Sequence, residues 1–308
     1  DAYPNANILV AADLDGRDDR QRFVGQTAVG DWDLVIVPQS VFSRIAMRRE
    51  AQIEYLEGEL AELREALDAA NSQGADFTVK QIEQAIKNAE ARVEKIIAAK
   101  ATDEGLTFEQ SGADFLFIDE AHDYKNLTRP SNSADLAVTN GSQRATDLEM
   151  KAKYLREKAR ARNVEQGMAH APAKAIAFAT GTPISNSLSE IWVMTKYLRP
   201  DLLHKAGLGR IDNWAGTFAK PVSVPEMNTT ATRIQMKTRM AEYANVPQLV
   251  AMLDQFRDVV TSDRIPVRLP VLDGGAPKIV EFDMGQDAID AMADLDVRMS
   301  RIQGDRMD

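Results

Sequence analysis

The sequence predicts an α/β protein built on parallel strands, and three observations support that prediction. Short apolar runs of strand length occur at residues 7–11, 33–37, 115–118 and 173–179. Residues 17–29 have the pattern of a helix, and a strand–helix–strand unit places its strands parallel with a right-handed crossover. Polar residues follow the last two runs directly, and α/β sheets bind ligands at that edge.

The first strand–helix–strand unit spans residues 7–37 and is followed by Pro38. Phe23 is the expected anchor of its helix. Three polar residues follow the second strand, and turn or helix-cap chemistry is one explanation for Gln39, Ser40 and Arg44.

Residues 48–100 carry two heptad patterns, which predict an antiparallel helical hairpin of coiled-coil type. The repeating apolar residues are Ile53, Leu56, Leu60, Leu63 and Leu67, then Ile82, Ile86, Ala89, Val93 and Ile96. A polar turn at 71–76 separates the two series. Each stripe is too narrow to be buried alone, so we expect the helices to pair and to project from the α/β body. The hairpin is either an arm that contacts protein or DNA, or a spacer with a solvated outer face.

Residues 115–127 hold the strongest candidate for a chemical site. Their first four residues are apolar and predict a strand covered on both faces. Asp119 and Glu120 follow at once. In a nucleoside-triphosphate motor, one carboxylate holds the Mg²⁺ that bridges the phosphates, and a second polar group orients the attacking water. Asp119 fits the first role and Glu120 the second, whereas the alternative is a solvated acidic turn.

The next segment leads into a helix with an excess of positive charge. Residues 128–141 are polar and predict a surface loop near a nucleotide or DNA. Residues 146–164 predict a helix with Leu148 and Leu155 facing inward and an acidic first turn. Its later turns contain one acidic residue and six basic ones: Lys151, Lys153, Arg156, Lys158, Arg160 and Arg162. This helix is either a phosphate-contacting stripe or an ordinary solvated face.

The strand predicted at 173–179 brings three small residues to the same sheet edge as Asp119. They are Thr180, Gly181 and Thr182. A threonine hydroxyl there can hydrogen-bond to the acidic motif, and glycine allows the backbone to turn tightly.

The helix that follows begins with the capping-box spacing of Ser187 and Glu190 and ends before Pro200. Trp192 lies on its apolar face and is expected to pack in the core. Beyond it, the sequence predicts a segment anchored by Trp214 and Phe218, with no catalytic feature. The other expected elements are a helix at 246–260, an extended stretch at 264–270, a strand at 278–282 and a helix from 286.

Composition is that of a globular protein without membrane spans. The chain has 308 residues, 44% of them hydrophobic, enough for one large or two modest domains. It has no 18-residue apolar run and no signal-peptide pattern, so we expect a cytoplasmic protein with no membrane partner. With no cysteine and three scattered histidines, disulfides, thiolate chemistry and cysteine-based zinc sites are excluded.

Two motifs resemble those of Swi/Snf-type ATPases in helicase superfamily two. Asp119-Glu120-Ala121-His122, followed by Lys125-Asn126, resembles that family's second motif. Residues 179–186, with 190–192 and 198–200, resemble its third motif and extension. The similarity runs over about residues 3–292. It is nearest to large helicase-like proteins of phages, plasmids and integrative elements, which often accompany DNA-methyltransferase segments.

The resemblance implies a RecA-like first ATPase lobe that uses ATP and Mg²⁺. It assigns catalysis to Asp119, Glu120 and His122, and the Mg²⁺ to Asp119. Nucleotide binding falls to Asp119, Glu120, Thr180, Gly181 and Thr182. Its implied partners are double-stranded DNA, a second ATPase lobe of the same polypeptide and a methyltransferase segment.

The resemblance also gives the polar residues after the second strand a role, since Gln39, Ser40 and Arg44 lie where family members contact the DNA backbone. On the basic helix, the candidate contacts are Lys153, Arg156 and Arg160. The formal net charge is −10, so nucleic acid must bind a local basic patch.

The chain contains no Gly-x-x-x-x-Gly-Lys-Ser/Thr, so the phosphate-binding loop is expected upstream, in a longer polypeptide. We expect residues 1–47 and 111–200 to form an incomplete first lobe and 48–110 the hairpin. Residues 201–308 would be a mostly helical extension toward the second lobe. The predicted function is ATP-driven movement on DNA, with this chain inactive by itself. The alternative is a non-enzymatic interaction or scaffold module that binds through the hairpin.

Overall fold

The structure is a computed structural model that places most of the chain. It describes residues 3–11, 16–72, 76–98, 107–131, 133, 135–138, 141–185, 187–227, 234–261, 264 and 278–304. Asn186 and nearly all of the stretch predicted at 264–270 lie outside the described residues. The chain divides into two compact units, Asp1–Lys220 with Met240–Phe256, and Pro221–Arg239 with Arg257–Asp308.

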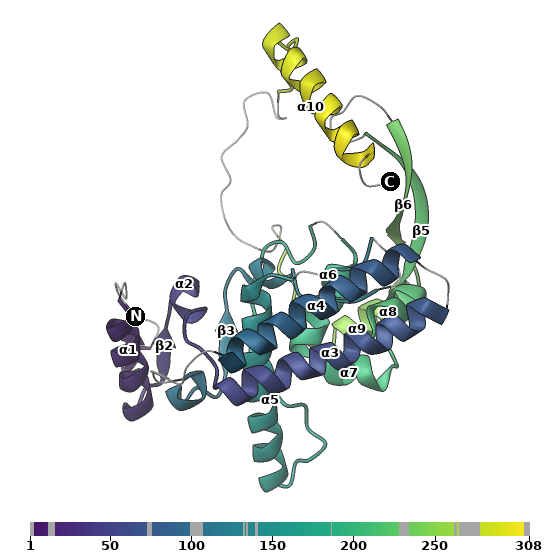
Figure 1. Ribbon diagram of the computed structural model, residues 1–308. Coiled ribbons are helices and arrows are strands. Elements are labelled where there is room, and N and C mark those ends of the chain that lie inside the picture. Colours follow the sequence, from purple (N-terminus) through teal and green to yellow (C-terminus); the bar gives the residue numbers. More distant parts are fainter. Residues whose placement is uncertain are drawn as a thin grey trace. The chain divides into compact units, whose positions relative to one another are not determined.

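The N-terminal strand–helix–strand unit forms as the sequence predicts (Figure 1). β1 (Ile8–Val10) pairs in parallel with β2 (Leu34–Ile36), and α1 (Arg17–Val29) connects them. Phe23 is buried in the main hydrophobic core, which confirms the predicted anchor. The short helix α2 (Gln39–Phe42) follows β2 directly.

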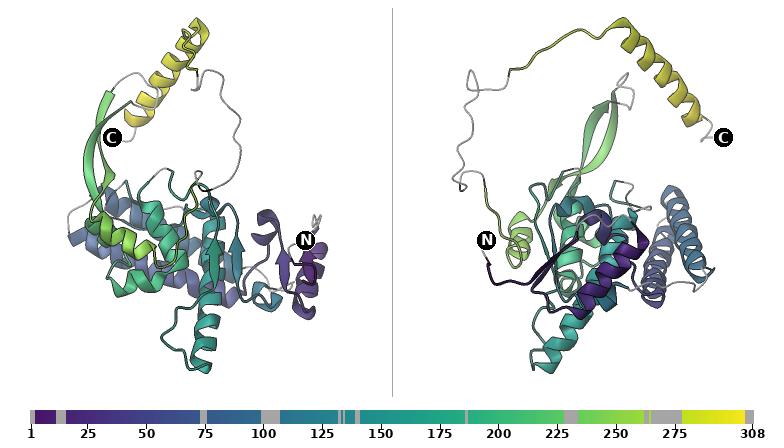
Figure 2. Two further views of the ribbon diagram at one scale, coloured as in Figure 1. Left: turned by 180° about the vertical axis from the view of Figure 1, so that it is seen from behind. Right: turned by 90° about the vertical axis from the view of Figure 1, so that its left-hand side faces the viewer.

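A second parallel pair carries the two polar motifs. β3 (Leu116–Ile118) lies beside β4 (Ile176–Phe178), and beyond them the Ala121 amide donates to the Ala179 carbonyl over 3.0 Å. The segments after β3 and β4 therefore leave the same edge, as predicted. Among the described residues, the four strands form two separate pairs rather than one sheet, so a RecA-like lobe stays a prediction. Figure 2 shows both pairs from behind.

The prediction that β3 is covered on both faces is wrong. Ile118 is only 8% exposed, whereas Phe117 is 69% exposed. Successive residues of a strand point to opposite faces, so these two side chains report on the two sides of the sheet. The buried face packs into a core that also contains residues of α5 (Gln143–Glu165) and α6 (Ser189–Leu198). The strand is therefore buried on one side only.

Tyr197 joins the acidic motif to the helices of the core. Its side chain is fully buried, and its hydroxyl lies 2.9 Å from the Ala145 carbonyl and 3.2 Å from the Tyr124 carbonyl. Burial, reinforced by the charge of Glu149, raises the pKa of this phenol well above its ordinary value. The hydroxyl therefore remains a neutral donor that links the 3₁₀ turn η2 (Ala121–Tyr124) to α5 and α6.

Helix α5 begins three residues earlier than predicted. Ser142 is its N-cap, and the Ser142 hydroxyl accepts from the Ala145 amide. Its first turn contains no acid, so the expected acidic start is wrong. Leu148 and Leu155 are fully buried, which confirms the predicted inward face.

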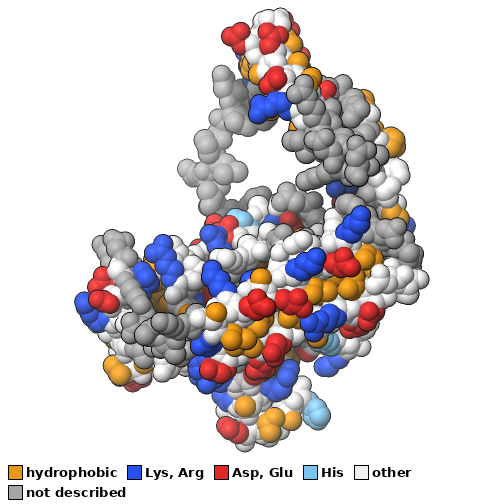
Figure 3. Space-filling model, viewed as in Figure 1, with side chains coloured by type: hydrophobic (Ala, Val, Ile, Leu, Met, Phe, Trp, Pro, Cys, Tyr) orange, Lys and Arg blue, Asp and Glu red, His pale blue; other side chains and the backbone are white. Residues whose placement is uncertain are grey.

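The two helices of the predicted hairpin pack against each other. α3 (Arg49–Ser72) and α4 (Asp76–Ala98) run in opposite directions, because Arg49 near the start of α3 donates to the Ile97 carbonyl near the end of α4. Their shared apolar cluster consists of Leu60, Leu63, Ala66, Ala70, Ile82, Ala85 and Ala89. Figure 3 shows apolar side chains between the helices, with acidic and basic ones interspersed around them. Coiled-coil packing of this pair stays a prediction.

The hairpin does not project freely from the α/β body. α3 contacts α5, and three of its glutamates form ion pairs with helices or loops of the body. These pairs are Glu54–Lys153 at 3.7 Å, Glu62–Lys196 at 3.7 Å and Glu65–Arg210 at 3.2 Å. The heptad pattern describes the face of α3 toward α4, and it contains no information about this second contact.

The segment after the acidic motif, residues 128–141, is not the free surface loop that its polarity predicts. Leu136 lies in the core, and Arg129 is buried with its Nε donating to the Leu136 carbonyl. The base of the segment is closed by the Ser142 amide, which donates to the Asn126 carbonyl over 2.7 Å. The described part of this loop is therefore folded back onto the body.

Gly141 permits that closure, because a Cβ there would lie 2.4 Å from the backbone nitrogen of Thr128. We expect Gly141→Ala to lower the free energy of unfolding by about 1–3 kcal/mol, the usual cost of overpacking. Gly58→Ala is the matched control. No atom lies within 4 Å of a Cβ at that position of α3, so alanine should stabilise by about 0.8–1 kcal/mol. Urea unfolding measures both, and equal effects would contradict the role given to Gly141.

The C-terminal third contains helices and one unpredicted strand pair. α7 (Pro200–Lys205), α8 (Ile211–Phe218) and α9 (Val246–Leu253) belong to the first unit. Trp214 and Phe218 are buried, as predicted. α9 stops seven residues before the predicted end at 260.

β5 (Ala219–Met227) and β6 (Ile234–Tyr243) form a two-stranded sheet, so the prediction of a mostly helical extension is incomplete. Residues 278–282 form no strand, and α10 (Gln286–Gly304) begins where predicted. Among the described residues, no helix is both long and apolar enough to cross a bilayer.

Candidate functional site

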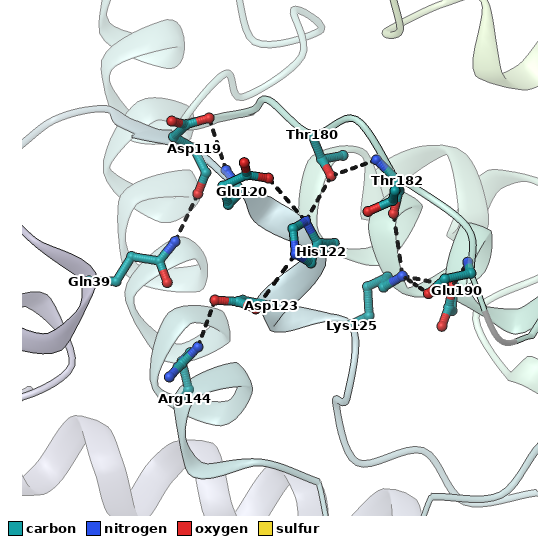
Figure 4. Close-up of polar contacts among 11 residues, drawn as sticks. Gln39, Asp119, Glu120, His122, Asp123, Lys125, Arg144, Thr180, Thr182 and Glu190 are labelled. Atoms are coloured by element: carbon teal, nitrogen blue, oxygen red, sulfur yellow. Dashed lines mark hydrogen bonds and ion pairs between the residues drawn. The ribbon is translucent and has the colours of Figure 1, made fainter. Parts of the chain in front are cut away.

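The carboxylates of the acidic motif lie exposed at the end of β3 (Figure 4). Asp119 follows the strand directly, and one of its carboxylate oxygens accepts from the Glu120 amide over 3.0 Å. Both side chains are exposed. A carboxylate that keeps accessible oxygens at a sheet edge can bind a cation or orient a water molecule.

Glu120 has an unusual backbone conformation. Its φ of 50° and ψ of 46° fall in the left-handed region, where residues other than glycine, asparagine and aspartate are uncommon. The strain of such a residue is of order 1–3 kcal/mol and is found preferentially at functional sites. The conformation turns the chain sharply from β3 into η2.

His122 connects the acidic motif to the segment after β4. Its Nδ1 lies 3.2 Å from the Thr180 hydroxyl and 3.2 Å from a Glu120 carboxylate oxygen. Thr180 in turn accepts from the Thr182 amide over 3.2 Å. The histidine and the first threonine therefore hold the two motifs side by side, as expected for Thr180. Gly181 is exposed, with no atom within 4 Å of a Cβ built on it.

A buried ion pair reinforces this junction. Lys125 Nζ lies 3.0 Å from a Glu190 carboxylate oxygen, and their side chains are 10% and 7% exposed. The same ammonium group donates to the Ser185 hydroxyl over 2.6 Å and to the Thr182 carbonyl over 3.3 Å. Lys125 thus ties the second motif to both the loop and the helix of the third.

Glu190 does not act in the predicted capping box. Its carboxylate accepts from the Ser185 amide over 2.6 Å and from Lys125. The Ser187 hydroxyl accepts from the Ser189 amide over 3.3 Å, and the Glu190 amide donates to the Ser187 main-chain carbonyl. Charge pairing in the interior outweighs local capping here, because a buried carboxylate without a cation would be costly. Trp192 is buried and its indole donates to the Leu208 carbonyl, which confirms the predicted packing role.

The sequence does not predict a buried pair of Lys125 with Glu190. Lys125 has the polar neighbours Asp123 and Asn126, and Ser189 precedes Glu190, so neither charge stands within an apolar stretch. A charged residue is rarely buried unless it is paired, and the fold brings these two together.

Gln39 points toward the acidic motif. Its side-chain amide donates to the Asp119 main-chain carbonyl over 2.9 Å, so it links α2 to the end of β3. Ser40 and Arg44 are exposed. Of the three predicted DNA contacts in this segment, the first is therefore engaged inside the protein.

The basic helix α5 is not a uniform cationic stripe. Lys151 is fully buried, and Arg156 is 11% exposed with its guanidinium bound to Glu149 and to the Tyr197 carbonyl. The prediction that Arg156 faces DNA is wrong. The helical repeat gives the reason for the lysine, since Lys151 stands three residues after Leu148 and four before Leu155 on the apolar face.

Two basic residues of this helix keep the predicted surface position. Lys153 is half-buried and lies 3.7 Å from Glu54 of the hairpin. Arg160 is exposed at the rim of a pocket that also contains His170 and Lys205.

The donors at the sheet edge fit a Mg²⁺–nucleotide complex. Asp119 offers one exposed carboxylate, and protein sites for Mg²⁺ with nucleotides use one or two carboxylates, with phosphates and water completing the shell. Over the part of the chain that the structure describes, no three histidine, aspartate or glutamate side chains gather as an all-protein metal site.

The family described as a probable helicase domain matches residues 1–261. No curated protein and no solved structure matches the chain. The family match covers the acidic motif, the segment after β4 and the hairpin alike, and it spans well over half of the 308 residues. The chain therefore belongs to the family of probable helicase domains.

Proposed function

We propose that this chain is part of the first lobe of an ATP-driven DNA translocase, of Swi/Snf type within helicase superfamily two. The observation that carries the proposal is the 3.2 Å contact of His122 with Thr180, residues 58 positions apart in the sequence. It brings the two motifs together at one sheet edge, where a nucleotide site requires them. The proposed location is the cytoplasm of a bacterial or phage-infected cell.

The exposed carboxylates have distinct proposed roles. Asp119 would hold the Mg²⁺, which when bound neutralises charge on the phosphates. Glu120 would orient the attacking water, with His122 3.2 Å from its carboxylate and in contact with the Thr180 hydroxyl. Thr180, Gly181 and Thr182 would line the nucleotide side of this edge. These assignments rest on the exposure of both acids and on the contacts of the histidine.

The proposed activity needs parts that we expect elsewhere in a longer polypeptide. A phosphate-binding loop and a second ATPase lobe would complete the site, and a methyltransferase segment is a further proposed neighbour. A link to phages or other mobile elements belongs to the same proposal. The 308-residue chain alone is therefore expected to hydrolyse ATP no faster than a buffer control.

Duplex DNA is the proposed track, and the exposed basic residues are its candidate contacts. Exposed Arg44 follows α2, and Arg160 and half-buried Lys153 lie on α5, while the exposed hydroxyl of Ser40 is a further candidate contact. Contacts of this kind neutralise phosphates and give affinity without sequence preference.

Asp119→Asn in the full-length polypeptide tests the nucleotide site. The substitution keeps the side-chain shape and removes the charge, so the gain in ATP affinity caused by Mg²⁺ should fall at least about tenfold. Affinity in EDTA should change little, because the phosphate contacts do not involve this residue. Fluorescent ATP titrations with and without Mg²⁺ measure both.

Asp114→Asn is the matched control for this test, since Asp114 is also exposed but precedes β3. An equal loss of affinity in Mg²⁺ and in EDTA would contradict the role of Asp119. The family match does not favour the alternative of a non-enzymatic interaction module.

A further inference from the structure

Each end of helix α2 forms a hydrogen bond with a segment that is distant in the sequence. At its start, the Gln39 amide donates to the Asp119 carbonyl over 2.9 Å. At its end, the Phe42 carbonyl accepts from Lys151 Nζ over 2.8 Å. A four-residue helix has little stability of its own, so these two contacts and the burial of Phe42 fix its position.

The contact at the end of α2 is rigid. Lys151 is fully buried, and its ammonium group lies 2.6 Å from Asp147 and 4.1 Å from the centre of the Phe42 ring. Burial lowers the pKa of this lysine, and the neighbouring Asp147 carboxylate opposes that effect. Removal of α2 from Lys151 would take one of two hydrogen-bond acceptors from a fully buried ammonium group, which is costly. The end of α2 is therefore the fixed point about which its start can shift.

The contact at the start of α2 is softer and lies next to the site. Gln39 is half-buried, and the bond is a single neutral one to the main chain of the residue proposed to hold Mg²⁺. The exposed side chain of Ser40 stands directly after it, whereas exposed Arg44 lies two residues beyond the end of α2. A polyanion bound to Ser40 would act on α2 at the residue next to Gln39, and Arg44 would hold the same polyanion beyond the fixed end of the helix.

We propose that Gln39 is a positioning residue that couples a nucleic-acid backbone on Ser40 and Arg44 to the placement of the Asp119 carboxylate. The inference rests on the proposed function and adds the route by which DNA stimulates hydrolysis. Asp119 is held from two sides, by Gln39 on its carbonyl and by the Glu120 amide on its carboxylate. A shift of α2 therefore changes the orientation of the whole residue.

A coupling carried by one neutral hydrogen bond is limited in size. Its loss corresponds to about a 2- to 10-fold change in an equilibrium or a rate ratio. The coupling is measured by the stimulation factor, which is the ATPase rate at saturating duplex DNA divided by the rate without DNA.

The test uses two variants of the full-length polypeptide. Gln39→Leu removes the amide, and Gln39→Asn keeps the amide but shortens the side chain by one methylene. Both should reduce the stimulation factor about 2- to 10-fold. The DNA dissociation constant should stay within about twofold of wild type, because the amide faces Asp119. Gln248→Leu, at an exposed glutamine of α9, should leave the factor unchanged.

Three results would overturn the proposal. An unchanged factor in both variants excludes the coupling. Weaker DNA binding with full stimulation at saturation would make Gln39 a direct contact, and an equal fall of both rates would make it merely structural. If the wild type itself shows no stimulation by DNA, the proposed function fails before this inference is reached, so the two failures are distinguishable.

Discussion

Replacement of Glu120 by glutamine is expected to reduce ATP hydrolysis by the full-length polypeptide about 10²- to 10⁴-fold. Glutamine has nearly the same shape but lacks the negative charge that orients and activates water. The contact of the side chain with His122 at 3.2 Å can persist, because an amide oxygen also accepts hydrogen bonds. ATP binding should persist, so the substitution should lower the turnover rate without weakening the affinity for ATP.

The control for this experiment is Glu157→Gln, the same change at an exposed position of α5 remote in sequence from the motif. Its turnover should equal that of wild type, as measured by phosphate release at saturating ATP. Wild-type turnover in Glu120→Gln would refute the assignment of Glu120 and leave the acidic turn as a purely structural feature.

Loss of the Lys125 ammonium group should produce the largest change in stability. Lys125→Met removes the ammonium group that lies 3.0 Å from the buried Glu190 carboxylate, and breaking a buried pair in this way costs about 3–5 kcal/mol. Glu190→Gln should also destabilise, because it leaves the lysine unpaired. In the double variant both charges of this pair are removed, and glutamine can still accept from the Ser185 amide. Its loss should be smaller than the sum of the single losses by about 1–3 kcal/mol.

An exposed pair of the same length provides the comparison. Arg64 and Glu90 join α3 to α4 at 2.9 Å, but their side chains are 61% and 45% exposed. Arg64→Met should therefore cost no more than about 1 kcal/mol. Guanidinium unfolding of all four variants gives the free energies. Similar losses at the two pairs would show that burial does not determine the strength of the Lys125–Glu190 contact.

The sequence predicts the local elements of the site well. Apolar runs that end in polar residues identify both strand pairs, and the contact of His122 with Thr180 bears out the expectation that both motifs leave one edge. These features depend on short-range periodicity and on the geometry of parallel strands, and both are properties of the residues themselves. The same is true of α1 and of the inward face of α5.

Tertiary pairing is what the sequence does not reveal. Arg156 has the composition of a surface residue, and only the fold brings Glu149 and the Tyr197 carbonyl to it. Phe117 belongs to an apolar run, yet its face of the strand pair is exposed. In β5, Pro221 and Pro225 argue against a strand, but a two-stranded sheet consists only of edge strands, where proline is tolerated.

The left-handed conformation of Glu120 has a consequence for selection. Glycine adopts that conformation without strain, so Glu120→Gly should stabilise the fold while it abolishes the carboxylate. A single base change converts either glutamate codon into a glycine codon. A mutant library screened for thermal resistance alone would therefore enrich this variant, which the proposed role of Glu120 predicts to be inactive. Wherever glutamate persists at this position across a population, its retention measures how strongly hydrolysis, rather than folding, is under selection.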